Sequence, residues 1–451
     1  MARALSKTQI SHTKKLISSS AKRKAQVRLI RRHDLGQSKE VKQYRLKNGL
    51  DLILLSDHSA PVLSYQTWFR VGSRHEKKGK TGLAHLFEHL MFNETKHLPA
   101  GQFDRILESA GGETNAATWL DWTFYYENLP SSKLELVASM EAERMVNLVL
   151  RKPQLDSEKE VVANERRYRV EDDIHGAVNE KLYATAFRKH PYHWPTIGWM
   201  EDILNFKLQD CREFYKTFYA PNNATIVISG DVSEEDALHC IEKHYGKLPS
   251  AKIPKEKAVK ENTQRTERKL TMRLPTPTEK LQLGYRSPAL ADPDHTVLCI
   301  IDEMLFGGRS SRLHRSMVVE AEAASEVSSF VGSFKDPGLY EIWISMREGK
   351  SSKKGLALFE KEIRRFCHGP IRAEELDKAK NRFELSFLQG MENNSGRAEG
   401  LGFYATVLGD FTQAFSRMGQ VRGISVADLR RVSKKYFNKT SRTTITVLPK
   451  E

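Results

Sequence analysis

The 451-residue chain has few cysteines, no long apolar run, and no acidic residue among its first 33 positions. The four cysteines lie far apart and form no CxxC pair: Cys211, Cys240, Cys299 and Cys367. Their spacing argues against a disulfide framework or a cysteine zinc site and favours a reducing compartment. No stretch of ~18 apolar residues occurs, which argues against a membrane-spanning helix. With 39% apolar and 29% charged residues, a folded mixed α/β protein is expected.

The missing acidic residues make the N-terminus strongly basic. Ten Lys and Arg residues within positions 1–33 account for ten units of the net charge of +15, which leaves +5 for the remaining 418 residues. The segment lacks the apolar region of a secretory signal, whereas its Arg, Lys and Ser content is typical of mitochondrial transit peptides and of disordered basic extensions. Because no aromatic residue lies between the charges, a nucleic-acid-binding arm is the weaker interpretation. We expect a disordered tail over residues 1–40 and a bacterial cytoplasmic location, with the mitochondrial matrix as the alternative.

The chain also shows weak internal similarity. The segments "DCREFYKTFYAPNNATIVISGDV" (210–232) and "DLRRVSKKYFNKTSRTTITVLPK" (428–450) both combine an amphipathic helix, an aromatic pair, an Asn-containing turn and a β-branched strand. This pattern predicts two copies of one α/β unit. Residues 247–269, between the copies, are charged, contain two prolines and have little apolar periodicity, which is typical of a linker. The predicted domains are residues 41–247 and 268–449, joined by residues 248–267.

The order of elements in the first half predicts an α+β fold. Strand-like runs occur at "LDLILLSD" and "LSYQTWFRV", a helix at "AGQFDRILESAGG", and an aromatic-rich hairpin at "ETNAATWLDWTFYYENLP". Such mixing of hairpins and helices indicates α+β layering rather than a parallel wound sheet. We expect each unit to contain a mostly antiparallel sheet packed against helices.

The stretch "TGLAHLFEHLMF" (81–92) places three titratable residues in an apolar run, and burying them unpaired would cost free energy. On a helix, His85 and His89 are at i and i+4, so they project from the same face and can reach one ion. Glu88 points about a quarter-turn aside, which suits it better to bond a water molecule near the ion than to ligate. Two nitrogen ligands and a nearby carboxylate are parts of a hydrolytic zinc site, with a third ligand from elsewhere.

The segment "HLFEH" matches the inverted HxxEH motif of the inverzincins. Together with "GLAHLFEHLMFNETKHLP", "AGGETNAATWLDWTFYYENLP" and "HPYHWPTIGWMEDI", it resembles the pitrilysin/insulinase-type zinc peptidases, the M16 family. The resemblance is closest to the short subfamily that includes mitochondrial processing peptidase and bacterial insulinase-like peptidases. It covers about residues 41–449 and is thinner in the second half. It implies a zinc endopeptidase with one Zn²⁺ per chain, in which each chain forms half of a clamshell and Glu88 transfers the proton.

The resemblance also assigns further residues. Glu165, in "ANERR", lies 76 positions after His89 and is the implied third zinc ligand. Glu158 lies seven residues earlier on the same helical face and would orient a ligand rather than bind the ion. The strand "GGETNAATW" would be the sheet edge to which a substrate adds as an extra strand, with Asn115 and Ala116 as candidate substrate-binding residues. An ordinary structural strand is the alternative.

One departure from the family pattern falls in "FGGRSSRLHRSMVVEAEAASEVSSF" (306–330). Catalytic relatives carry here an Arg and, seven residues later, a Tyr that stabilise the oxyanion. The corresponding residues of this chain are Val318 and Ser325, which cannot supply a charged or phenolic donor. We therefore expect a heterodimer with a second family member that carries the Arg and Tyr. Local substitution by Arg309, Arg312 or Arg315 is the alternative.

Two other function classes remain open. Some relatives in respiratory complexes are non-catalytic structural proteins. These typically have degraded zinc motifs, whereas His85, Glu88, His89 and Glu165 are all present here. A binding module that contacts nucleic acid or an anionic membrane through the basic tail is the other class. We expect a peptide substrate and no nucleic-acid partner.

Overall fold

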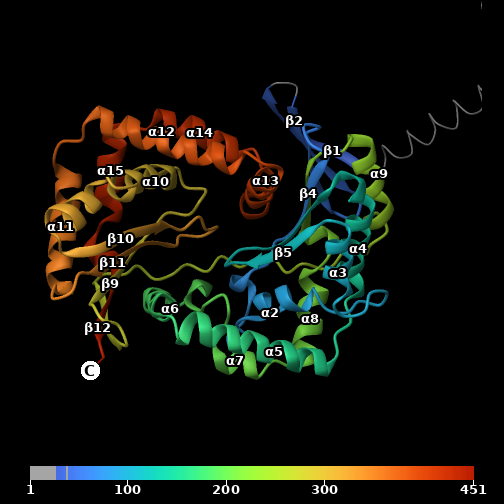
Figure 1. The fold of residues 1–451 in the computed structure, drawn as a ribbon, viewed down its shortest axis with the longest axis horizontal. Helices are drawn as coiled ribbons and strands as arrows, with labels where there is room; N and C mark the ends of the chain where they lie inside the picture. The colour runs from blue at the N-terminus through green and yellow to red at the C-terminus, as the bar shows by residue number, and fades with distance from the viewer. Residues whose placement is uncertain (1–26, 37–38, 451) are drawn as a thin grey trace, which may run out of the picture.

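The computed structural model describes residues 27–36 and 39–450, which form two β-sheets with helices packed against them (Figure 1). The first sheet has the strand order β1-β2-β3-β7-β4-β6-β5. Its strands are β1 (Val27–Gly36), β2 (Lys39–Leu46), β3 (Asp51–Ser56), β4 (Val62–Phe69), β5 (Glu113–Thr118), β6 (Thr123–Pro130) and β7 (Ala224–Gly230). The second sheet has the order β10-β11-β9-β12-β8. Its strands are β8 (Arg268–Leu274), β9 (Lys280–Arg286), β10 (Ala324–Val331), β11 (Leu339–Met346) and β12 (Arg442–Pro449).

Helices surround both sheets. In the first half they are α2 (Leu83–Leu90), α3 (Gln102–Ser109), α4 (Leu134–Asn147), α5 (Lys152–Arg166), α6 (Ile174–Ala186), α7 (Met200–Leu204), α8 (Leu208–Phe218) and α9 (Glu234–Tyr245). In the second half they are α10 (Pro293–Phe306), α11 (Ser352–His368), α12 (Ala373–Gly390), α13 (Asn394–Leu408), α14 (Gln413–Gly423) and α15 (Val426–Tyr436). Two π-helical segments, η3 (Arg167–Glu171) and η6 (His314–Glu320), follow α5 and α10. None of the helices in the described part of the chain is long and apolar enough to cross a membrane.

The two sheets share one topology, which confirms the α+β fold with two similar halves. The run β3-β7-β4-β6-β5 of the first sheet corresponds strand by strand to β8-β12-β9-β11-β10 of the second. In each run only the first pair, β3–β7 or β8–β12, is parallel, and the other pairs are antiparallel. The repeated segments predicted from the sequence are α8 followed by β7 and α15 followed by β12.

Each half contributes a helix to the other half's sheet. Helix α13 packs on β4 and β7, where Leu401 and Ala405 contact a buried cluster that includes Trp68 and Phe124. The approach is close at Gly402, since an added Cβ would lie 2.2 Å from Nε1 of Trp68. Figure 1 shows α13 between the two sheets. The sequence predicts two successive units, and this exchange shows that each sheet depends on residues from both.

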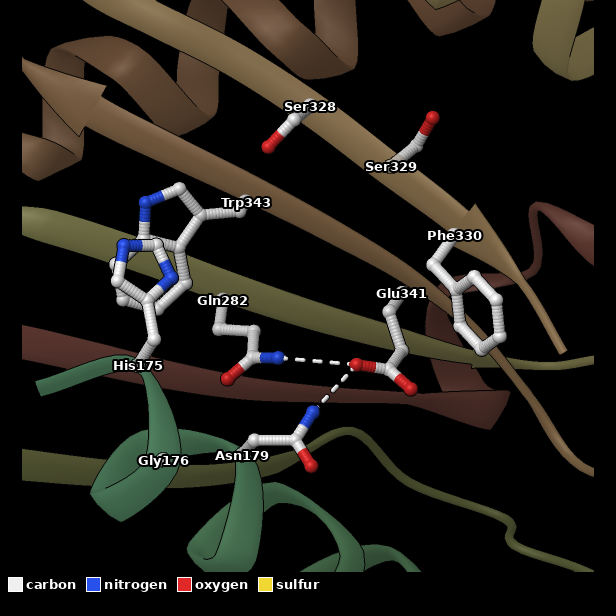
Figure 2. A pocket seen from close by; sticks show the side chains of 9 residues that line it. All are labelled: His175, Gly176, Asn179, Gln282, Ser328, Ser329, Phe330, Glu341 and Trp343. Atoms are coloured by element: carbon white, nitrogen blue, oxygen red, sulfur yellow. Dashed lines mark hydrogen bonds between the residues drawn. The ribbon is translucent and has the colours of Figure 1, made fainter. Parts of the chain in front are cut away.

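Helix α6 makes the reciprocal contact with β8, β9 and β12. Beside it, a cavity of about 370 Å³ is lined by the half-buried side chain of Glu341 (Figure 2). Asn179 and Tyr183 of α6 donate hydrogen bonds to Glu341 over 2.5 and 2.6 Å, and Gln282 of β9 donates over 3.2 Å. Burial raises the pKa of Glu341 to about 7. A single acidic side chain of the second sheet therefore anchors the helix that arrives from the first half.

The predicted tail boundary at residue 40 is wrong, because residues 27–36 form strand β1. β1 pairs antiparallel with β2 at the edge of the first sheet. His33 stacks on Phe415 at 4.5 Å, and Arg31 forms an ion pair with Asp410 at 2.6 Å. Basic side chains are common on edge strands, where they discourage pairing with other chains, so the charge concealed the strand. Residues 1–26 of the predicted tail lie outside the described residues.

Residues 248–265, in the expected linker, contain neither helix nor strand. The segment is nevertheless attached to both halves. Glu261 accepts hydrogen bonds from the backbone N–H groups of Arg188, Lys189 and His190 over 2.7–3.0 Å. Gln264 donates to the carbonyl of Arg442 over 2.6 Å. We therefore keep the two domains and the linker at residues 248–267 as a proposal. In the structure, many contacts join the two halves.

Candidate metal centre

Helix α2 presents the titratable residues of the HLFEH segment. Its apolar side chains Leu86, Phe87 and Leu90 are buried in the main core of the first half. The side chains of His85 and His89 are 8% and 24% exposed and face α5, which packs against α2. Folding therefore separates the two kinds of residue in this run, with the apolar ones in the core and the histidines at the contact between two helices.

The start of α2 is fixed by residues outside the motif. Glu76 accepts hydrogen bonds from the backbone N–H groups of Gly82 and Ala84, each over 2.8 Å, which satisfies donors that the helix itself leaves free. Gly82 adopts φ +94°, and an added Cβ would lie 2.4 Å from the carbonyl oxygen of Ile197. A side chain at this position would therefore push α2 away from the loop before α7. Together, Glu76 and Gly82 set the position from which the histidines project.

Glu165, near the end of α5, lies against both histidines. Its Oε2 atom is 3.5 Å from Nε2 of His85 and 3.3 Å from Nε2 of His89. Tetrahedral zinc with bonds of about 2.0–2.2 Å to nitrogen and oxygen places its ligand atoms about 3.3–3.6 Å apart. The observed separations match that requirement without rearrangement of the helices.

Unsatisfied polar atoms at this point also fit a metal ion. Oε2 of Glu165 is buried and has no hydrogen-bond partner among the described residues. Burial lowers the pKa of His85 to about 4, so the imidazole is neutral at pH 7, which is the form that binds metals. Three donors of the types that zinc prefers thus converge, and an ion would satisfy the buried oxygen.

Two further residues hold the ligands in place. Oε2 of Glu158 lies 3.6 Å from Nδ1 of His89, and its Oε1 accepts a hydrogen bond from Asn93 over 2.9 Å. Arg169, one turn beyond Glu165 in η3, is within 3.0 Å of the Oε1 atom of Glu165. Glu158 was predicted from the sequence, whereas Asn93 and Arg169 were missed. The i,i+4 spacing of Glu165 and Arg169 is the one signal that could have indicated the second contact.

Glu88 is the remaining carboxylate of the motif. Burial raises its pKa, and its Oε2 atom has no hydrogen-bond partner in the part of the chain that the structure describes. A raised pKa makes the Glu88 carboxylate a stronger base than an exposed one, and its free oxygen can accept a proton. The arrangement therefore combines three candidate metal ligands with one candidate general base.

Strand β5 forms the edge of the first sheet and contacts α2. Asn115 is exposed and Ala116 is half-buried on this strand, which pairs with β6 on one side only. A cavity of about 440 Å³ lies beside it, lined by Phe92, Asp104, Glu108, Gly112, Glu113, Thr114 and Asn115. Among the described residues, no strand therefore pairs with the edge next to the candidate metal centre, and the cavity beside it is acidic.

The structure places Val318 in η6 and Ser325 in β10, within the second half. Two of the three arginines that were predicted to replace the missing Arg and Tyr already pair with carboxylates. Arg312 makes two hydrogen bonds to Glu375 over 2.6 and 2.7 Å, and Arg315 bonds Glu320 over 2.8 Å. Of the three arginines considered, Arg309 alone lacks such a carboxylate partner among the ion pairs of the described residues.

Comparison with known proteins gives one consistent result. Residues 52–198 match the family model described as insulinase (peptidase family M16), and residues 205–383 match the peptidase M16 inactive domain. The zinc protease PqqE of Helicobacter pylori is 32% identical over 416 residues, which covers 90% of this chain and 92% of that protein. The mitochondrial-processing peptidase subunit beta of Blastocladiella emersonii is 25% identical over 401 residues, covering 87% and 85%. A crystal structure of a protease from Helicobacter pylori superposes with a TM-score of 0.87 at 31% identity, covering 91% of this chain and 99% of that one.

Proposed function

The chain belongs to the M16 family of peptidases, and from this premise we propose that it is the zinc-bearing subunit of an endopeptidase. The observation that carries the proposal is the convergence of His85, His89 and Glu165, whose donor atoms lie within 4.8 Å of one another. Glu88 lies on α2 with the two histidines. Burial raises its pKa, which suits a general base. Names of bacterial relatives as zinc proteases support this function at the level of the family.

His85, His89 and Glu165 would hold one zinc ion. When bound, zinc would polarise a peptide carbonyl and acidify a water molecule. Glu88 accepts the proton of the attacking water and then donates it to the nitrogen of the leaving amine. Glu158 keeps His89 oriented through Nδ1, and Arg169 holds the second oxygen of Glu165. Each of these roles belongs to a residue of this chain and is open to substitution.

The free edge of β5 would bind the substrate as an added antiparallel strand. Backbone groups around Asn115 and Ala116 would form the pairing, which holds an extended peptide with little regard to its side chains. Selectivity would come from the cavity beside the edge, where Asp104, Glu108 and Glu113 favour a Lys or Arg side chain. The proposed substrates are therefore extended or unfolded segments that carry basic residues.

Zinc-loaded E88Q tests the proposed chemistry. With an internally quenched peptide that contains Lys and Arg, assayed in the presence of the second M16 subunit proposed below, kcat should fall by about 10²–10⁴-fold because the general base is lost. The zinc content should stay at the wild-type value, since Glu88 is not a ligand. E160Q is the matched control because Glu160 is exposed on α5, and it should retain full activity. An E88Q variant as active as E160Q would refute the mechanism.

We further propose that activity needs a second M16 subunit, because Val318 and Ser325 replace the expected Arg and Tyr. The partner would carry that pair and close the other half of the clamshell. Activity should appear when the zinc-loaded chain is assayed with a co-purified family member and be absent from either chain alone. Ordinary enzymatic rates from this chain alone would contradict the partner proposal. An inactive zinc-loaded pair would instead favour a non-catalytic, structural role.

A further inference from the structure

We propose that Glu135, Cys240 and His244 form a second, separate zinc-binding site on the outer side of the first half. Glu135 comes from α4, and Cys240 and His244 come from the neighbouring α9. The proposal does not depend on the peptidase function. Figure 1 shows α4 and α9 beside the first sheet, whereas α5 of the candidate metal centre runs along another side of the molecule.

The donor atoms of the three side chains lie close enough together for one metal ion to reach all of them. Nε2 of His244 is 2.8 Å from Oε1 of Glu135, and Sγ of Cys240 is 3.5 Å from Oε2 of Glu135. All three donor atoms lie within 4.8 Å of one another. Cys240 and His244 are at i and i+4 of α9, so both project toward α4 from one helical face. Small side-chain rotations would bring these atoms to the ligand separations of a tetrahedral zinc site.

The donor set favours zinc over the harder divalent cations. A thiolate and an imidazole bind Zn²⁺ well, whereas Mg²⁺ and Ca²⁺ prefer oxygen ligands alone. Glu135 and His244 are partly accessible, with side chains 54% and 17% exposed, so an ion can enter from solvent and keep a water molecule as its fourth ligand. The thiol of Cys240 is buried at 4% exposure, which places the sulfur at the inner end of the site.

Lys243 is the group that competes with an ion. Its ammonium group pairs with Oε1 of Glu135 and would have to leave when a cation binds. The side chain of Lys243 is 54% exposed and can turn into solvent. Binding must also release the proton of Cys240, whose pKa burial raises to about 12. We therefore expect a site that is weaker than the His85–His89–Glu165 centre and that binds more strongly as the pH rises.

Cobalt distinguishes the two sites because only the second contains sulfur. Added to the metal-free full-length chain, Co²⁺ should produce a near-ultraviolet band from thiolate-to-cobalt charge transfer, and zinc should displace it. C240S should lose the band. C211S, which alters another buried cysteine, is the matched control and should keep it. K243M should bind about fivefold more tightly, since a neighbouring positive charge is removed.

The outcomes separate the proposal from a chance cluster. A band in the wild-type chain that survives in H85A/H89A and disappears in C240S supports the second site. The absence of a band in both the wild-type chain and K243M would overturn it, and so would a band that persists in C240S. Because K243M leaves every proposed ligand intact, it tests the site even if C240S fails to fold.

Discussion

The three titratable side chains on α2 each have a contact or a proposed role that accounts for their burial. His85 and His89 converge on Glu165, while Glu88 keeps a free oxygen beside them. The surrounding contacts with Glu158 and Arg169 restrict how the ligands can move. At the scale of single residues, the carboxylate of Glu158 and the guanidinium of Arg169 therefore lie beside the three candidate ligands without being candidate ligands themselves.

Glu158 provides a direct test of this arrangement. E158Q should weaken zinc binding by about 10–100-fold, because a neutral amide supports the imidazole of His89 less well than a carboxylate does. Competition with a chromophoric chelator measures the affinity. E160Q removes a carboxylate two positions away on the exposed face of α5 and should bind zinc as the wild-type chain does. Equal affinities for the two variants would show that Glu158 does not support the ligand.

The sequence predicted part of this centre. Helical spacing placed His85 and His89 on one face, and the family resemblance pointed to Glu165 and Glu158; the structure brings all four together. The metal-ligating roles of His85, His89 and Glu165 and the orienting role of Glu158 remain predictions. Glu76, which caps α2, could not be predicted because a buried carboxylate that bonds two backbone amides leaves no periodic signal.

At the scale of elements, α6 packs on the second sheet through apolar side chains and through hydrogen bonds to one ionisable group, Glu341. Glu341 is half-buried between α6 and the second sheet, and its hydrogen bonds come from neutral donors (Figure 2). His175 stacks on Trp343 at 3.9 Å beside it. The ion pairs of the described residues include none for Glu341, so no cation there offsets the cost of ionising it.

This predicts a pH-dependent stability. Burial raises the pKa of Glu341 to about 7 from its ordinary value of about 4.5, so the folded protein binds the proton more strongly than the unfolded chain. Stability should therefore fall as the pH rises from about 4.5 through 7, by roughly 3 kcal/mol at most. Denaturant unfolding of E341Q should lack this dependence. E326Q, at an exposed position of β10, should follow the wild-type curve, and an E341Q curve that also follows it would contradict the prediction.

Strand β1 shows where charge patterns mislead. It contains Val, Leu and Ile, which are common in strands, but the absence of acidic residues over positions 1–33 suggested a tail. The pairing partner β2 begins three residues after β1 ends. Edge strands bury few side chains, so their sequences carry a weak signal; pairing with β2 and the contacts with Asp410 and Phe415 define this one.

At the scale of the whole molecule, the two halves are interdependent. The sequence predicted two similar units in the correct order, but not the exchange of α6 and α13. A signal was present, since β3 and β7 are apolar almost throughout, and such strands are typically covered on both faces. The sequence does not show which helix supplies the second cover, because that depends on contacts between residues more than 150 positions apart.

The exchange predicts that neither half folds alone. A fragment of residues 27–250 lacks α13 and would expose Trp68, Phe124 and Val227, which are buried in the full chain. Exposing several such side chains costs more than about 5 kcal/mol, which is comparable to the stability of a domain. The fragment should aggregate or bind a hydrophobic dye, and adding residues 251–451 should reduce both effects. A monomeric fragment with a cooperative thermal transition would contradict this expectation.

The central claim is that one zinc ion is held by His85, His89 and Glu165. Anomalous diffraction at the zinc absorption edge, from crystals of the zinc-loaded chain, tests it most directly. We expect a strong peak between Nε2 of His85, Nε2 of His89 and the carboxylate of Glu165. Well-ordered density for these three side chains with no anomalous peak between them would contradict it.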